Sequence, residues 1–341
     1  MTMTITRHMA ALSTAALLMA GTASAETIVV GYQQIVGPFV AAIADGSLDA
    51  AAKKAGVTID WRQFSSGGDI STALASGNVP LGVIGSTGIA AAATRGVDVR
   101  LFWILDNIGK SEALIARDGS GIESPADLVG KKVAVPFVST SHFHLLVGMQ
   151  KVWHIDPTQV QILNMKPPQI MAAWQRGDID AAYVWPPALT QLMADGKIIT
   201  DSEQIGAASV PTFDGLVADR GFAEKHPEFM TEFTKALAKA YADYNADKAA
   251  WTAESQPVKD IIRMIGGDPA GTVEALTMLS FPDAKAQVSE TWLGDGATKA
   301  LSASATFLVE QKQIDKALPD YAPYVDATYA RAAAESQQAA N

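Results

Sequence analysis

Short apolar runs alternate with segments of helical periodicity through the first two-thirds of the chain. The apolar runs predict strands over 26–33, 57–64 and 79–84. Apolar residues at helical spacing predict helices over 39–55 and 70–76. Strands that alternate with helices in this way are typical of parallel-sheet α/β units.

The same order of elements returns one hundred residues later. Strands and helices are expected, in turn, over 132–136, 139–153, 160–165, 170–176 and 179–185. The segments 70–77 and 170–177 also share Ile, Ala and Gly at equivalent positions. Any βαβ unit has a similar pattern, so these identities are weak by themselves. Together with the matching order of elements, they predict two similar α/β lobes.

The pattern becomes helical after Asp214. One long helix is predicted by apolar residues at every fourth position, namely Phe229, Phe233, Leu237 and Tyr241. Further helices are expected over 258–265 and 299–311, and one is expected to begin at Asp268. The Ala-, Gln- and Ser-rich end, 332–341, is expected to fray.

The first 25 residues have the pattern of a secretory signal peptide. An uncharged run over 9–21 follows Arg7, and the small residues Ala23 and Ala25 form a cleavage site. The run is too short to span a membrane, and no later run is long enough. We expect residues 1–25 to be removed and the mature protein to lie in the periplasm, without insertion into the membrane. The alternative is a buried N-terminal helix.

Charge and composition limit the partners and cofactors that the protein could use. The chain has 341 residues, a net charge of −10 and no Cys. An acidic protein is a poor binder of nucleic acid or of anionic lipid. Without Cys, the sequence excludes disulfide scaffolds, Cys-ligated zinc, iron–sulfur clusters and Cys nucleophiles. We expect no cofactor and no nucleic-acid partner.

Candidate ligand-binding residues follow the carboxyl ends of the predicted strands, where open α/β sheets bind their ligands. They are Gln33, Ser86, Thr87, Ser139, Thr140, Ser141 and His142. Hydroxyl groups at a helix start cap free N–H groups, and together with those groups they can hold an anion. Capping alone explains one Ser-Thr pair, but two pairs at equivalent places of two lobes favour a ligand site.

Three further residues are candidates for the same cleft. Trp185 ends a predicted strand just before Pro186, which allows its ring to face the cleft. Glu112 and Asp214 each precede a short hydrophobic strand that could cross between the lobes. A carboxylate at such a place can pair with an ammonium group of a ligand. The alternative for either carboxylate is a solvated strand end.

Catalysis and metal binding have weak support. Ser139 and His142 could form part of a hydrolase triad, but no G-x-S-x-G motif is present and the hydroxyl is placed to cap a helix. His142 and His144 are two residues apart on a helix, so they face different ways. The sequence therefore predicts a binding protein, with no catalytic residues and no metal site.

Four segments carry a resemblance to a known family, and they are 130–143, 167–185, 195–204 and 222–228. In them the chain resembles the periplasmic taurine-binding proteins of bacterial ABC importers, within the family of sulfonate and nitrate receptors. The resemblance implies an α/β fold of the periplasmic binding protein type II class, with a ligand cleft between two lobes. It implies a first lobe of residues 26–112 plus 213–341 and a second lobe of residues 113–212.

The resemblance also implies a role and a site. The cleft would close on taurine by hinge motion, and the closed receptor would dock on a membrane permease and its ATPase. Ser86, Thr87 and the segment 139–142 would hold the sulfonate, and Gln33 would line the first lobe. Asp214 and Glu112 would meet the ammonium group. The face of Trp185 would add a cation–π interaction of roughly 0.5–2 kcal/mol.

The sequence departs from the family pattern at Thr87-Gly88, His144 and Pro186. These departures leave open a receptor for aliphatic sulfonates or for another small zwitterion. An enzyme on the same fold is a more distant alternative. Relatives of that kind act inside the cell with a Cys-rich motif, and this chain has no Cys.

Overall fold

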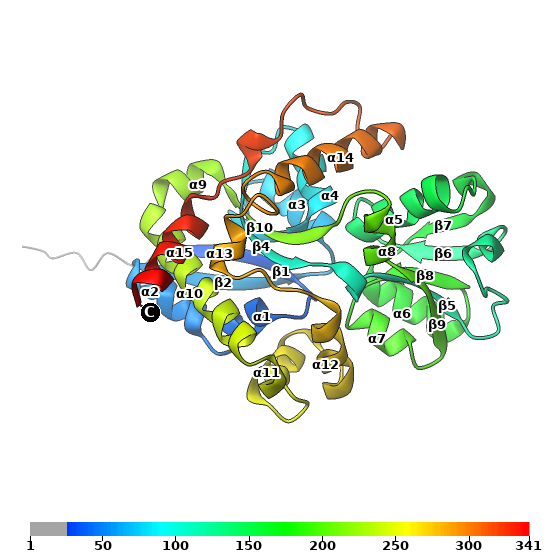
Figure 1. Ribbon diagram of the computed structural model, residues 1–341, viewed down its shortest axis with the longest axis horizontal. Helices are drawn as coiled ribbons and strands as arrows, with labels where there is room; N and C mark the ends of the chain where they lie inside the picture. Colours follow the sequence, from blue (N-terminus) through cyan, green and yellow to red (C-terminus); the bar gives the residue numbers. More distant parts are fainter. Residues whose placement is uncertain (1–25, 341) are drawn as a thin grey trace, which may run out of the picture.

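Two five-stranded sheets organise residues 26–340, the part of the chain that the computed structural model describes (Figure 1). The predicted signal peptide, 1–25, lies outside the described residues. The first sheet has the order β2-β1-β3-β10-β4, and the second has the order β7-β6-β8-β5-β9. The strands are β1 (Glu26–Gln33), β2 (Val57–Phe64), β3 (Leu81–Gly85), β4 (Val99–Asn107), β5 (Ala113–Arg117), β6 (Lys132–Val135), β7 (Gln161–Asn164), β8 (Ala181–Val184), β9 (Gly196–Asp201) and β10 (Phe213–Asp219).

Both sheets have the same plan. β1 pairs in parallel with β2 and β3, as β6 does with β7 and β8. The fourth strand is antiparallel in each sheet, with β10 between β3 and β4 and β5 between β8 and β9. The predicted α/β architecture with two similar lobes is confirmed. The sheets are mixed and not wholly parallel, because β10 is antiparallel to its neighbours in the first sheet and β5 is antiparallel to its neighbours in the second. Both strands come directly after the chain has passed from one sheet to the other.

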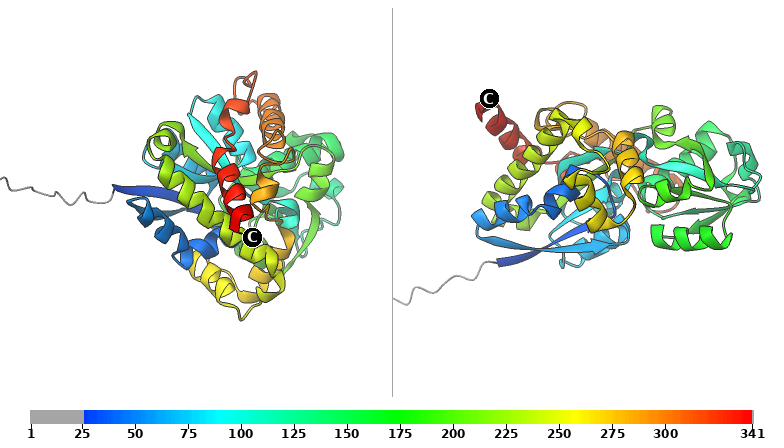
Figure 2. Two further views of the ribbon diagram at one scale, coloured as in Figure 1. Left: turned by 60° about the vertical axis from the view of Figure 1, so that its left-hand side comes forward. Right: turned by 90° about the horizontal axis from the view of Figure 1, so that it is seen from below.

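Helices pack on both faces of the second sheet, and helices surround the first (Figures 1 and 2). We call the parts built on the two sheets the first lobe and the second lobe. The first lobe has α1 (Pro38–Ala44), α2 (Ser47–Lys54), α3 (Gly67–Ala75), α4 (Ser86–Thr94), α9 (Arg220–Lys225), α10 (Pro227–Ala246), α11 (Gln256–Ile265), α12 (Pro269–Met278), α13 (Ala284–Gln287), α14 (Gly296–Glu310) and α15 (Thr328–Ala340). The second lobe has α5 (Thr140–Val147), α6 (Pro167–Arg176), α7 (Ala188–Leu192) and α8 (Ser202–Ala207). Shorter helical turns are η1 (Gly109–Ser111), η2 (Pro125–Leu128), η3 (Gly148–Val152), η4 (Pro157–Gln159), η5 (Lys248–Ala250) and η6 (Ala322–Tyr324).

Two predicted helices are interrupted. The segment 39–55 forms α1 and α2, because Gly46 between them takes a left-handed φ of 78° and turns the chain. The segment 139–153 forms α5 and then the π-helical turn η3. A Cβ atom at Gly148 would lie 2.5 Å from the ring of Trp153, so this glycine allows the indole to pack against the turn.

The C-terminal segment is helical, so the prediction that 332–341 frays is wrong for its described part. α15 continues to Ala340 and packs against α10. Ala330 and Ala333 are buried there. Their small side chains let two helices approach closely. Both described ends of the chain lie in the first lobe, away from the second (Figure 2). Among helices of residues 26–340, none is long and apolar enough to cross a membrane.

The longest helix, α10, has the buried face that the sequence predicted. Its four stripe residues, Phe229, Phe233, Leu237 and Tyr241, are all buried. The ring centroid of Phe233 lies 5.4 Å from that of Phe229 and 6.4 Å from that of Trp61 on β2. The helix therefore anchors one face of the first sheet.

Phe233→Ala should lower the free energy of unfolding by about 3–5 kcal/mol, because it leaves a cavity under β2. Lys239→Ala on the same helix is the control. Its side chain is 74% exposed, and its change should stay within about 0.5 kcal/mol. Urea denaturation of both variants checks this. Equal effects of the two substitutions would contradict the anchoring role.

Candidate functional site

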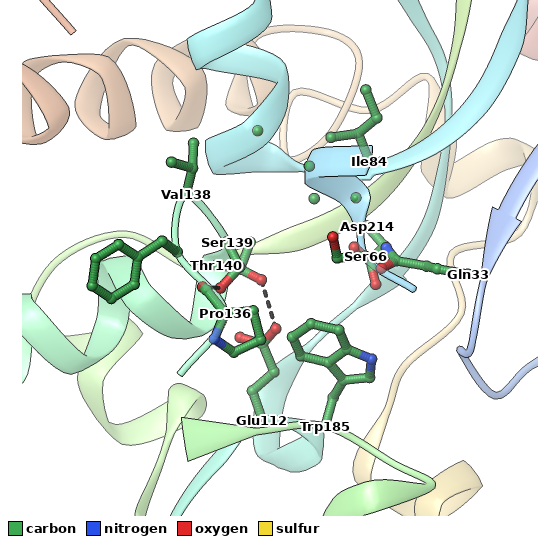
Figure 3. Close-up of a pocket in the computed structure, with 15 residues that line it drawn as sticks. Gln33, Ser66, Ile84, Glu112, Pro136, Val138, Ser139, Thr140, Trp185 and Asp214 are labelled. Carbon is green, nitrogen blue, oxygen red and sulfur yellow. Dashed lines mark hydrogen bonds between the residues drawn. The ribbon is translucent and has the colours of Figure 1, made fainter. Parts of the chain in front are cut away.

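A small cavity lies between the two lobes (Figure 3). The first lobe contributes the carboxyl ends of β1 and β3 and the start of α3. The second lobe contributes the start of α5 and the residue after β8. Six of the predicted site residues line it, namely Gln33, Glu112, Ser139, Thr140, Trp185 and Asp214.

Three helix N-termini converge on this cavity. Ser66 precedes α3, Gly85 precedes α4 and Ser139 precedes α5, and all three residues line the space. The first turn of each helix leaves backbone N–H groups free, and the helix dipole adds partial positive charge. Among the described residues, no Lys or Arg lines the cavity. The arrangement fits an anion held by neutral donors.

The capping hydroxyl groups are already engaged. Ser139 Oγ accepts a hydrogen bond of 3.1 Å from the backbone N–H of His142 and donates one of 2.6 Å to the carbonyl of Pro136. Ser66 Oγ accepts from the backbone N–H of Asp69 at 3.4 Å and donates to its carboxylate at 3.1 Å. The donors left for an anion are therefore the first-turn backbone amides more than the hydroxyl groups.

Gly85 allows the two lobes to come close. A Cβ atom at this position would lie 2.9 Å from Thr140 Cγ2 and 3.2 Å from Asp214 Oδ1. Both distances are shorter than ordinary van der Waals contact, so a side chain here would push apart β3 and the start of α5. The glycine is required by this close approach of the second lobe to the first.

Two carboxylates, Glu112 buried and Asp214 half-buried, form the acidic part of the wall. Thr140 Oγ1 donates a hydrogen bond of 2.5 Å to Glu112 Oε1 (Figure 3). Burial raises the pKa of Glu112 to about 8. The hydrogen bond from Thr140 opposes this rise, and the charge of Asp214 adds to it. Burial also raises the pKa of Asp214 to about 7. Each carboxylate would be stabilised in its charged form by a cation.

The indole of Trp185 forms another wall and connects the lobes. Its Nε1 donates a hydrogen bond of 3.1 Å to the carbonyl of Gln34 in the first lobe. The ring lies beside Glu112 in Figure 3. An aromatic face next to acidic groups can receive a ligand cation.

An ion pair also crosses between the lobes, next to the cavity. Lys166 Nζ, before α6, lies 2.7 and 2.8 Å from the two carboxylate oxygens of Asp69 in α3. Both side chains are partly exposed, at 46% and 34%, so the pair contributes about 1 kcal/mol or less. It fixes the position of α3 relative to α6 more than it stabilises the fold.

The side chains of the other four predicted residues do not line the cavity, and these residues are Ser86, Thr87, Ser141 and His142. All four are buried in the first turns of α4 and α5. The ring of His142 stacks on Phe137, with 4.3 Å between centroids, and its Nδ1 accepts a hydrogen bond from the N–H of Val138. Burial lowers the pKa of His142 to about 4, so this side chain is neutral.

The sequence analysis missed Ser66, Gly67 and Gly68, which line the cavity at the start of α3. They follow the strand 57–64, so the rule applied to the other strand ends could have found them. It also missed Asp106, a buried carboxylate within the apolar strand β4. Nothing in the local pattern distinguishes that position from the apolar residues around it.

Comparison with known proteins places the chain in a family. The NMT1/THI5-like family model matches residues 33–249. The taurine-binding periplasmic protein of Escherichia coli is 41% identical over 310 residues, which cover 90% of this chain and 93% of that protein.

Solved structures share the fold at lower identity. The alkanesulfonate-binding protein SsuA from Xanthomonas axonopodis pv. citri, bound to MOPS, has a TM-score of 0.72 at 22% identity, covering 88% of this chain and 98% of that one. The desulfurization enzyme DSZB has a TM-score of 0.61 at 15% identity, covering 92% and 99%. At these identities the similarity concerns the fold alone.

These findings agree with the resemblance in the four sequence segments, and that interpretation is confirmed. The two lobes, their sheets and the cavity between them are built from residues throughout the described chain, outside those four segments as well as within them. The chain belongs to the NMT1/THI5-like family and, within it, to the family of the taurine-binding periplasmic protein.

Proposed function

We propose that this protein is the periplasmic solute-binding receptor of an ABC importer, and that it captures taurine for a membrane permease driven by an ATPase. One observation carries the ligand assignment: three helix N-termini and two carboxylates, one of them buried and one half-buried, line one small space between the lobes. A sulfonate suits the helix N-termini, and an ammonium group suits the carboxylates. The name of the E. coli relative, taurine-binding periplasmic protein, supports the same ligand.

Each part of taurine has a partner in the cavity. The first-turn amides of α3, α4 and α5 hold the sulfonate, and the side-chain amide nitrogen of Gln33, which lines the same space, can donate to it as well. Asp214 and Glu112 receive the ammonium group, with the face of Trp185 beside it. Burying two charges is favourable only when each one is paired and hydrogen-bonded, and this arrangement meets that condition.

The size of taurine explains why the site is enclosed. Taurine has about seven heavy atoms, and a ceiling of roughly 1.5 kcal/mol for each allows about 10 kcal/mol of binding free energy. That corresponds to a dissociation constant no tighter than some tens of nanomolar. A receptor that works near this limit must contact almost every ligand atom, so it needs both lobes.

Binding without catalysis fits the polar contacts. The hydroxyl group of Ser139 donates a hydrogen bond to the carbonyl of Pro136, and His142 Nδ1 accepts one from the N–H of Val138. Neither group is free to act as a nucleophile and base pair. Within residues 26–340 no group of three His, Cys, Asp or Glu side chains is placed to hold a metal. The export pattern of the first 25 residues and the periplasmic relative support the location.

Calorimetric titration of residues 26–341 tests the proposal directly. Taurine should bind with a micromolar or tighter dissociation constant. Ethanesulfonate lacks the amine and β-alanine replaces the sulfonate, so each should bind about 100-fold more weakly or worse. Equal affinity for ethanesulfonate would contradict the ammonium site and point to an alkanesulfonate receptor. No binding of any of the three would overturn the ligand assignment.

Asp214→Asn should weaken taurine binding by about 30-fold or more, equivalent to about 2 kcal/mol, because the buried ammonium group loses a charged partner. Ethanesulfonate affinity should not fall in this variant. Asp243→Asn is the matched control, since that side chain is 63% exposed on α10, far from the cavity in sequence and fold. An equal loss for both ligands would mean that the substitution damages the site in general.

Taurine affinity should rise as the pH rises from about 6 to about 8. The pKa values of Asp214 and Glu112, about 7 and about 8, mean that the free receptor holds protons there at lower pH. An ammonium group binds the ionised carboxylates. At a pH below the carboxyl pKa values, ligand binding must therefore release these protons. Titrations in buffers of different ionisation enthalpy measure the protons released. A flat affinity over this range would contradict the pairing, and Asp214→Asn should reduce the slope.

A further inference from the structure

A second small cavity lies beside the first and shares three of its wall residues, Glu112, Trp185 and Asp214. The second cavity is also lined by Asp106 and by apolar side chains such as Ile35 and Leu279. A ligand longer than taurine could therefore extend past the shared wall.

Asp106 is a carboxylate that lines the second cavity and not the first. It lies on β4 directly opposite Asp214 on β10 and is only 2% exposed. Its Oδ1 has no hydrogen-bond partner among the described residues. The nearby hydroxyl group of Tyr241 donates to the carbonyl of Leu105 and does not reach the carboxylate. A buried acceptor without a donor is unfavourable, and a ligand could supply the missing donor.

The charges around Asp106 favour a cation there. Burial and the charges of Asp214 and Glu112 raise the pKa of Asp106 well above its ordinary value, and the backbone amide of Asp214 lowers it. No Lys or Arg lines either cavity in the described part of the chain. A cationic group placed between the three carboxylates would offset their mutual repulsion. The apolar walls nearby suit the methylene groups that would carry it.

We propose that Asp106 and the second cavity receive the cationic group of ω-amino sulfonates whose chain is longer than that of taurine. The inference rests on the proposed function, because it keeps the sulfonate on the helix N-termini and moves only the ammonium group. Ligands of this class would bind with the sulfonate in the first cavity and the ammonium group beyond Trp185, between Asp106 and Asp214. The receptor would then serve a group of amino sulfonates and not one compound.

Titration with taurine, homotaurine (3-aminopropanesulfonate) and the amine-free propanesulfonate tests this. Homotaurine should bind the wild-type protein within about tenfold of taurine, and propanesulfonate about 100-fold more weakly than homotaurine. Taurine binding with homotaurine at least about 100-fold weaker would overturn the inference and leave the proposed function intact. If neither amino sulfonate binds, the proposed function and this inference both fail.

Asp106→Asn then tests the residue. It removes the charge and keeps the shape, so the ratio of homotaurine to taurine dissociation constants should rise at least about fivefold. Asp243→Asn, which makes the same chemical change on the exposed face of α10, should leave the ratio unchanged. Measurable taurine binding shows that the Asp106 variant is folded. An unchanged ratio in that folded variant would overturn the role of Asp106, and loss of all binding would do so too, because it would show a general structural role.

Discussion

A carboxylate shielded from water needs a positive partner, and this fold places two of them, Glu112 buried and Asp214 half-buried, where the chain passes between lobes. Glu112 stands just before β5 and Asp214 lies at the start of β10. One side chain thus belongs to the entrance of the second sheet and the other to the first. In the proposed function, a ligand ammonium group that pairs with both carboxylates would connect the two lobes, so ligand capture and lobe closure would depend on the same interaction.

The short distances across the cavity show how tightly that interaction is enclosed. Gly85 leaves room for Thr140 and Asp214, and the indole N–H of Trp185 reaches a backbone carbonyl of the other lobe. The ion pair between Lys166 and Asp69 adds orientation at little energetic gain. Exclusion of water from such a space strengthens every charge–charge contact inside it. Small residues such as Gly67, Gly68 and Gly85 form much of the wall of this polar space, which lets backbone groups face it.

Local periodicity predicted most of the strands, because alternation and apolar runs reflect burial that a single segment can reveal, but it did not predict β4 or β9. It could not predict that β10 inserts antiparallel between β3 and β4, since that pairing joins segments more than one hundred residues apart. The break at Gly46 and the packing of α15 also depend on distant contacts. In the site, the strand-end rule found Gln33 and Ser139. It could have found Ser66, whereas Asp106 looks like any other position of an apolar strand.

The insertion of β10 into the first sheet has a consequence for the order in which the chain can fold. Strands β5 to β9 follow one another between Ala113 and Asp201, so the second lobe is complete as one continuous stretch. The first sheet stays open between β3 and β4 until residues 213–219 arrive. During synthesis from the N-terminus, the second lobe can thus form while the first is still unfinished. The later-synthesised part of the first lobe then closes a sheet whose first strand begins at Glu26, a long-range step that slows folding.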